Sequence, residues 1–380
     1  MRAQDGTTAT SRRAGPAAHG KGDASFGLES DRLSFDVLDA WFPPCPRAVE
    51  AGASAVEWTL RSSPSCDGAV LLSAVAASRG IDLDGLSLGA GSSEIIHRIL
   101  PRLFGPGPVV VTDPTYSEYA FVAEDLHGRR VRRFELDPDD GFLIDVKRLV
   151  EFSAGASVVI VVNPNNPTGG CLSRSDVLRL RDALPTRTAL WIDEAYVDYA
   201  APGCSVEVDA VVTTGLYVLK SLSKAYGLSG ARVAYLVCAP LEASEFRRGT
   251  PPWIVGHAAT LAAIEALRNG PYYQGRYAET AAMRSALAEK IRGLGFEVWD
   301  GALNAVLIRL PDGYRSPEVT TNLARMGVFV RDPVGMGRVL SDRYIRVSVK
   351  PEDQQVRLLA ALCSVLELGT PAHISGLNRP

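Results

Sequence analysis

From about residue 84 to residue 250 the chain alternates short apolar runs with turn residues and amphipathic stretches. Short apolar runs bounded by turn residues are typical of buried strands, and apolar residues three or four positions apart are typical of helices. The pattern predicts strands at 109–112, 130–135, 157–162, 189–192, 216–219 and 233–238, and helices at 94–103, 117–126, 173–183 and 252–268. Strands that alternate with helices predict an α/β fold, with a mostly parallel sheet sandwiched by helices.

The flanking parts of the chain predict a second, smaller α+β domain. A strand is expected at 33–37, helices at 47–60 and 69–79, and a long polar helix at 273–293. After that helix, apolar runs at 296–298, 305–310, 328–331 and 344–349 predict a small sheet, covered by helices at 317–326 and 352–368. The expected boundaries are a disordered tail at 1–27, an arm and part of the small domain at 28–80, the large domain at 81–268, the C-terminal small domain at 269–370, and a frayed end at 371–380.

Composition and charge narrow the class of protein. Hydrophobic residues make up 46% of the 380 residues and charged residues 22%, which is ordinary for a soluble globular protein. A net charge of −3 gives no reason to expect nucleic acid or an anionic membrane as a partner. The six cysteines form no Cys-x-x-Cys pair, the five histidines lack metal-ligand spacing, and no apolar run reaches membrane-spanning length. We therefore expect a cytoplasmic protein without a protein-built metal site.

Polar motifs follow several of the predicted strands. They are Gly-Ala-Gly-Ser-Ser-Glu at 89–94, Asn-Pro-Asn-Asn-Pro-Thr-Gly-Gly at 163–170, Asp-Glu-Ala-Tyr at 193–196, and the serine- and glycine-rich stretch 220–235. Ligands of open parallel sheets bind beyond the carboxyl ends of the strands. Singly, each motif is explained by turn chemistry, a helix cap or a general anion site. Four of them in one domain are hard to explain by turns alone.

Lys224 lies among serines in the last of these motifs. Only six of the 40 basic residues are lysines, and the others are arginines. A lysine can lose its proton and form an imine with an aldehyde, whereas an arginine stays protonated. An exposed loop lysine remains the plain alternative when the stretch is considered by itself.

The order of these motifs, with Asp-Pro-Thr-Tyr at 113–116 and Ser-x-Ser-Lys-x-x-Gly-Leu-x-Gly-x-Arg at 221–232, resembles the fold-type I pyridoxal-phosphate enzymes. Within them the chain looks like the class I/II aminotransferases, and is most similar to the histidinol-phosphate aminotransferase branch. The resemblance runs from about residue 35 to residue 368. It implies an aspartate aminotransferase-like large domain, pyridoxal 5'-phosphate as the cofactor, and a homodimer.

The resemblance also implies a role for each polar residue of the motifs. Lys224 would hold the cofactor aldehyde as an imine (the internal aldimine) and later move the substrate's alpha proton. Asp193 would pair with the pyridine nitrogen, Asn166 and Tyr196 would hydrogen-bond the phenolic oxygen, and Tyr116 would stack on the ring. The expected phosphate ligands are Ser92, Ser93, Ser221, Ser223 and Arg232. The Asn166–Pro167 peptide bond is expected to be cis.

Substrate recognition is where the chain departs from this family. Arg346 matches the arginine that pairs with the substrate carboxylate, and Arg331 matches one that helps to hold a phosphorylated side chain, with a surface ion pair as the alternative for each. The arm reads Leu-Asp-Ala-Trp-Phe-Pro-Pro at 38–44 where relatives read roughly Asn-Glu-Asn-Pro-x-Gly-Pro, so Trp41 would border a bulkier pocket. Ser63 stands in place of a tyrosine that crosses between subunits, and Lys350 in place of a glycine.

These observations predict an aminotransferase that acts on an amino acid, or a similar amine, and a 2-oxo acid, in specialised metabolism. The alternative is a pyridoxal-phosphate-dependent decarboxylase similar to threonine-phosphate decarboxylase, because the bond that breaks depends on pocket geometry. A non-catalytic binding protein is less favoured because the lysine and its partners are intact. A nicotinamide enzyme is excluded because Glu94 stands at the third glycine position of that fingerprint.

Overall fold

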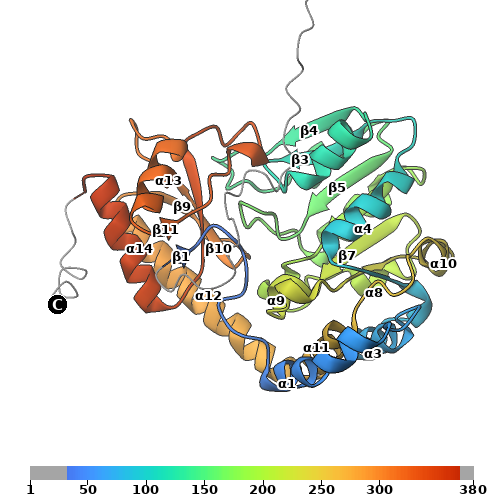
Figure 1. Cartoon of the computed structure of the whole chain (residues 1–380). Helices are drawn as coiled ribbons and strands as arrows, with labels where there is room; N and C mark the ends of the chain where they lie inside the picture. The colour runs from blue at the N-terminus through green and yellow to red at the C-terminus, as the bar shows by residue number, and fades with distance from the viewer. Residues whose placement is uncertain (1–31, 369–380) are drawn as a thin grey trace, which may run out of the picture.

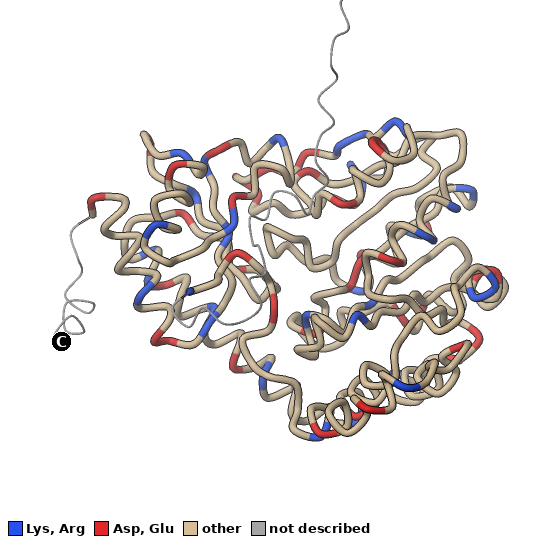
Figure 2. The backbone as a smooth tube through the Cα atoms, viewed as in Figure 1, with Lys and Arg blue, Asp and Glu red and all other residues tan. Residues whose placement is uncertain are grey.

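The computed structural model describes residues 32–368, which form a large and a small domain side by side (Figure 1). The predicted tails at 1–27 and 371–380 lie outside the described residues. In the described part of the chain, no helix is both long and apolar enough to cross a membrane. The same residues contain no cluster of histidine, cysteine and acidic side chains that could hold a metal ion. Acidic and basic residues are interspersed in both domains (Figure 2).

The large domain is built on a seven-stranded sheet in the order β2-β8-β7-β6-β5-β3-β4. The strands are β2 (Leu86–Gly89), β3 (Val109–Asp113), β4 (Val131–Glu135), β5 (Val158–Val162), β6 (Ala189–Asp193), β7 (Leu216–Ser221) and β8 (Ala234–Val237). Neighbouring strands from β4 to β7 are parallel, and β8 runs antiparallel to both β7 and β2. The prediction of a mostly parallel sheet is confirmed.

Helices cover both faces of this sheet. They are α4 (Ser92–Arg98), α5 (Glu118–Phe121), α6 (Val146–Phe152), α7 (Arg174–Ala183), α8 (Glu207–Ala210), α9 (Leu222–Ala225), α10 (Pro240–Arg248) and α11 (His257–Arg268). Helix α5 continues directly into a π-helix, η4 (Val122–Leu126). All five residues of β5 are buried, with alternate side chains in two different apolar cores. A strand buried on both faces explains why its sequence is continuously apolar.

The small domain has its own sheet and its own core. Strands β9 (Glu297–Trp299), β10 (Ala305–Arg309) and β12 (Tyr344–Ser348) are antiparallel, and β1 (Leu33–Ser34) pairs with β11 (Val328–Phe329). The helices are α12 (Gly270–Arg292), α13 (Ser316–Arg325) and α14 (Glu352–Val365). The N-terminal strand therefore joins the C-terminal third of the chain, as predicted.

The helices that follow the arm belong to the large domain, which corrects the expected boundary at residue 80. They are α1 (Pro46–Ser54), α2 (Val56–Arg61) and α3 (Ala69–Arg79). Helices α1 and α3 pack against α11 (Figure 1). Leu72 and Val75 of α3 are buried in the same core as Leu88 of β2. Only the first part of the segment 28–80 extends the small domain.

Candidate active site

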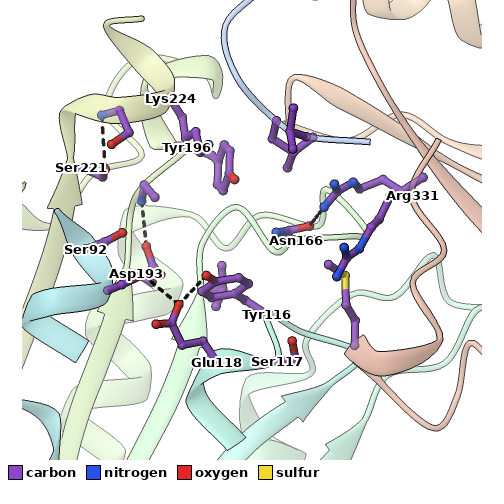
Figure 3. A pocket seen from close by; sticks show the side chains of 18 of the residues that line it. Ser92, Tyr116, Ser117, Glu118, Asn166, Asp193, Tyr196, Ser221, Lys224 and Arg331 are labelled. Atoms are coloured by element: carbon purple, nitrogen blue, oxygen red, sulfur yellow. Dashed lines mark hydrogen bonds between the residues drawn. The ribbon is translucent and has the colours of Figure 1, made fainter. Parts of the chain in front are cut away.

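A cavity of about 650 Å³ lies at the carboxyl ends of β5, β6 and β7, between the two domains. All ten residues predicted to bind the cofactor line this cavity, together with both predicted substrate arginines: Ser92, Ser93, Tyr116, Asn166, Asp193, Tyr196, Ser221, Ser223, Lys224, Arg232, Arg331 and Arg346. Figure 3 shows side chains from the large domain facing Arg331 of the small domain across it. The parallel strands bring the separate motifs together because their carboxyl ends share one edge of the sheet.

Asp193 ends β6 at the floor of the cavity and is 4% exposed. The Tyr119 hydroxyl donates to its Oδ2 at 2.6 Å, and the Ala195 N–H donates to its Oδ1 at 2.9 Å. Burial raises the pKa of Asp193 to about 6, although these two hydrogen bonds act in the opposite direction. A buried carboxylate held in place in this way fits a ligand that brings a positive charge, as a protonated pyridine nitrogen does. Tyr119 was missed by the sequence reasoning.

The two lysines of the last motif have different surroundings. Lys224 lies in α9, with its side chain 27% exposed, and lines the cavity. Lys220 is 2% exposed, and its ammonium lies 3.3 Å from Glu194 Oε2 within a buried cluster that includes Asp198 and Glu207. Because a lysine that bonds an aldehyde must reach the cavity, Lys224 fits this role and the fully enclosed Lys220 does not.

Asn166 and Tyr196 both line the cavity, and Arg346 acts on both of them. Arg346 Nη1 donates to Asn166 Oδ1 at 2.8 Å, which leaves the amide NH₂ as the donor group of that side chain. Burial raises the pKa of the Tyr196 phenol, with Arg346 opposing and Asp193 adding to the effect. Tyr196 therefore stays a hydroxyl donor, and both side chains could donate to a phenolate oxygen. The Asn166–Pro167 peptide is cis, as predicted.

Tyr116 lines the cavity from the loop before α5, and its hydroxyl donates to Glu118 Oε2. Glu118 is buried and also bonds the Ser93 hydroxyl and the His97 ring, each at 3.0 Å. Sequence reasoning missed Glu118, although it follows Tyr116 by only two positions. Because the Ser93 hydroxyl donates to Glu118, an anion could use the Ser93 backbone N–H at the start of α4.

The residues predicted to bind the cofactor phosphate lie in the first turn of α4, at the start of α9 and in the turn that follows α9. Ser221 caps α9 by accepting from the Ser223 N–H at 3.3 Å. Arg232 has a left-handed backbone, with φ of 53°, and its Nη1 donates to the Ser229 carbonyl at 3.1 Å. Backbone strain of this kind at a non-glycine residue is common at ligand sites. The Arg232 guanidinium therefore lies next to Gly91, directly before the N-terminus of α4, where an anion could contact both.

Gly91 provides the space in which the Arg232 guanidinium lies. Its φ is 86°, and a Cβ at this position would overlap the guanidinium nitrogen Nη2. Gly91→Ala should therefore displace Arg232 and weaken phosphate binding, raising the dissociation constant of the cofactor by about tenfold or more. Cofactor titration followed by absorbance measures this change.

Gly80→Ala is the matched control for that variant. Gly80 also has a positive φ, 65°, but a Cβ there would meet no atom within 4 Å. Gly80 has a left-handed helical backbone, with ψ of 34°, which alanine tolerates better than the φ of 86° and ψ of 163° at Gly91. Gly80→Ala should therefore show the cost of a positive φ with cofactor affinity unchanged. Equal losses of affinity in the two variants would contradict the assignment of Arg232.

Arg331 and Arg346 present two guanidinium groups to the small-domain side of the cavity. The Nε atoms of both are buried without a hydrogen-bond partner among residues 32–368. Burial and the nearby Arg331 charge together lower the pKa of Arg346 to about 10, with Tyr196 acting in the opposite direction. Two neighbouring guanidinium groups, each with an unpartnered Nε and one of them fully buried, fit an anionic ligand that would neutralise them.

Trp41 is placed elsewhere than the sequence reasoning expected. Its indole N–H donates to the Thr280 hydroxyl at 2.8 Å, and the Arg276 guanidinium lies 5.5 Å from the centre of its ring. Trp41 therefore packs on α12 and is not among the residues of this chain that line the cavity. The arm contributes 36–38 instead, because Asn304 Nδ2 bonds the Leu38 carbonyl at 2.9 Å and turns the preceding residues inward.

The side chains around the cavity thus match the chemical groups of pyridoxal phosphate. A buried carboxylate, two donors for a phenolate, an anion site and a lysine amine are arranged around one space, with paired guanidinium groups opposite them. Each polar group of the cofactor would contact a side chain of opposite charge, or a hydrogen-bond donor where the cofactor offers an acceptor.

Comparison with known proteins gives an independent result. Residues 32–362 match the family model for aminotransferase class I and II. The CMP-5'-(3-aminopropyl)phosphonate synthase of Streptomyces rubellomurinus is 32% identical over 90% of the chain, which spans only 53% of that protein. The histidinol-phosphate aminotransferase from Sinorhizobium meliloti, solved with pyridoxal-5'-phosphate, is 25% identical with a TM-score of 0.78, covering 87% of this chain and 90% of the other. The L-threonine-O-3-phosphate decarboxylase from Porphyromonas gingivalis shares the fold, with a TM-score of 0.77 at 21% identity over 88% and 99% of the two chains.

Proposed function

Since the chain belongs to the class I and II aminotransferase family, we propose that it transfers an amino group between an amino acid, or a similar amine, and a 2-oxo acid. The chain is a pyridoxal-phosphate-dependent enzyme of the aspartate aminotransferase-like fold. The observation that carries the proposal is the cavity in which Lys224, Asp193 and the two guanidinium groups meet. A cytoplasmic enzyme of specialised metabolism is the setting we propose for it.

The cofactor supplies an electron-withdrawing ring that stabilises negative charge next to the substrate nitrogen. In our proposal Asp193 keeps the pyridine nitrogen protonated, while Tyr196 and Asn166 donate to the phenolic oxygen. Lys224 Nζ would hold the cofactor through its aldehyde carbon, and the same nitrogen as a free amine would carry the alpha proton. The turn residues Ser92, Ser221, Ser223 and Arg232 hold the phosphate, and Tyr116 packs on the ring.

Arg346 binds the substrate carboxylate in this proposal, with Arg331 for a second anionic group. Two adjacent guanidinium groups favour a substrate with more than one negative charge. The family branch alone would suggest histidinol phosphate as the substrate. The altered arm and the absence of Trp41 from the cavity support a different substrate.

The second candidate is a decarboxylase that uses the same cofactor residues. Its support is the fold shared with the threonine phosphate decarboxylase, and the relative whose name describes the synthesis of an aminopropyl phosphonate. The same Lys224 nitrogen would then return a proton to the carbon that lost carbon dioxide.

A single turnover distinguishes the two reactions. The loaded enzyme is mixed with candidate amino acids that carry a second acidic group, without a 2-oxo acid. Conversion of the cofactor to pyridoxamine phosphate, with one 2-oxo acid formed, is the expected result. Release of carbon dioxide with the cofactor unchanged would instead establish the decarboxylase, and a cofactor that never binds would contradict both.

We also infer a homodimer, with the interface on the α1 to α3 side of the large domain. Val56, Trp58 and Leu60 of α2 and Trp253 of the loop before α11 are large apolar residues that are at least half exposed. A group of such residues on one side of a monomer fits association with a second copy. Sedimentation equilibrium should give twice the chain mass of 40.7 kDa, and Leu60→Asp should shift the protein toward the monomer.

A further inference from the structure

The arm before α1 crosses from the small domain to the large domain over the cavity. Arg346 Nη2 donates to the Asp36 carbonyl at 2.5 Å, and Asn304 donates to the Leu38 carbonyl at 2.9 Å. These two bonds fix the arm backbone on the small-domain side. The next residue, Asp39, can then extend its side chain to the large domain.

The Asp39 carboxylate is held at the catalytic lysine. Its Oδ1 accepts from Lys224 Nζ at 2.6 Å and from the Ser229 hydroxyl at 2.6 Å. Burial would raise the pKa of Asp39, but the Lys224 charge and hydrogen bond, with help from Ser229 and Lys350, lower it below the usual value. Asp39 is therefore a fixed anion at the nitrogen that would bond the cofactor.

Lys350 is the second charged group at this place. Burial lowers its pKa, and the charges of Asp39 and Asp36 oppose that effect while Lys224 adds to it. Asp39 of the arm and Lys350 both depart from the family pattern, and both lie near enough to Lys224 to act on its charge. Other ionisable groups that sense Asp39 are Tyr196 and Tyr199, both of which burial keeps protonated.

We propose that Asp39 is a further catalytic residue that binds whichever amino group is not bonded to the cofactor. It holds the Lys224 nitrogen when that nitrogen is an ammonium, and it receives the ammonium of the substrate when Lys224 is bonded. The exchange balances because the three protons of the incoming ammonium end on the Lys224 nitrogen that is released, which gives one up before it serves as the base for the alpha proton. The proposal rests on the proposed role of Lys224. Its physical basis is that the two amines exchange at one carbon and carry the same charge, so one anion placed beside Nζ serves both in turn.

The loaded enzyme tests the part that concerns the substrate. Two amine probes are compared by stopped-flow absorbance at neutral pH: methylamine, which is a cation, and O-methylhydroxylamine, which is neutral. Asp39→Asn should slow the reaction with methylamine about threefold to tenfold more than the reaction with O-methylhydroxylamine. Asp39→Glu should restore the ratio. An unchanged ratio in Asp39→Asn would overturn the proposal, because a merely structural role would slow both probes alike.

The cofactor-free full-length chain tests the contact with Lys224 itself. Acetic anhydride should label Lys224 about threefold to tenfold faster in Asp39→Asn, because the hydrogen bond that occupies its ammonium is lost. In Lys350→Met labelling should become slower, because Lys224 is then the one lysine charge near Asp39 that the described residues supply. The Lys290–Glu352 pair, with a 2.9 Å contact on the surface, is the internal reference, and Glu352→Gln is its matched control.

This second measurement separates the two proposals. If the protein binds no cofactor at Lys224, the proposed function fails, yet the labelling of Lys224 still reports on its contact with Asp39. If the cofactor binds and labelling is the same in Asp39→Asn and the unmodified chain, the contact with Asp39 is absent and only this inference fails.

Discussion

Replacing Lys224 by alanine should remove the visible absorbance of the bound cofactor and lower turnover by at least about 10³-fold. The variant loses both the amine that bonds the aldehyde and the base that carries the alpha proton. The fold should persist, because Lys224 is 27% exposed and its main polar contacts are with Asp39 in the arm. Borohydride reduction of the unmodified enzyme followed by peptide mass spectrometry should place the cofactor on Lys224.

Lys220→Met is the matched control, since Lys220 lies four residues earlier in the same motif. Its ammonium faces Glu194, Asp198 and Glu207 in the interior, so removing it leaves buried carboxylates without their partner. Such a change typically costs about 3–5 kcal/mol of stability. Lys220→Met should therefore unfold more easily yet still carry the cofactor on Lys224. A borohydride label on Lys220 would refute the assignment.

The cofactor side of the site could be predicted from the sequence for a geometric reason. Asn166, Asp193 and Lys224 each follow an apolar run, and parallel strands end at one edge of the sheet whatever the loops do. The sequence reasoning needed only the alternation of strands and helices to bring the three residues together. It did not need to know how either domain packs.

The parts that were missed depend on packing between segments far apart in the chain. Trp41 was expected at the substrate, but a hydrogen-bond partner on α12 holds it away from the cavity. Tyr119 enters the site because it bonds Asp193 of β6, and Glu118 because it bonds Ser93 of α4, and no local sequence pattern shows either contact. Asp39 reaches Lys224 only because side chains of the small domain fix the arm. The substrate side of the site is built from such contacts, so it was the less predictable half.

Asp193→Asn should have opposite effects on the cofactor-free and the loaded protein. In the cofactor-free chain, burial raises the pKa of Asp193 from 3.8 to about 6, so the folded state binds a proton more tightly than the unfolded state. The stability this gives is fully present below pH 4 and is lost as the pH rises through 6. Above that window the buried carboxylate destabilises the cofactor-free chain by up to about 3 kcal/mol relative to acidic pH.

The asparagine carries no charge that must be buried. At pH 8 the cofactor-free variant should therefore be more stable than the unmodified cofactor-free chain, by about 1–3 kcal/mol, and the difference should vanish near pH 4. Urea unfolding at both pH values measures it. Asp140→Asn, at an exposed aspartate, should leave stability unchanged.

Addition of pyridoxal phosphate should reverse the order of the two proteins. The unmodified enzyme gains a cation, the protonated ring nitrogen, opposite the carboxylate that burial had disfavoured, whereas the asparagine can offer only a neutral contact. Saturating cofactor should then raise the unfolding midpoint of the unmodified enzyme more than that of Asp193→Asn. Equal stabilisation of both proteins would mean that Asp193 does not meet the ring nitrogen. The buried Asp193 carboxylate would thus lower the free energy of unfolding of the cofactor-free protein and raise that of the protein with bound cofactor.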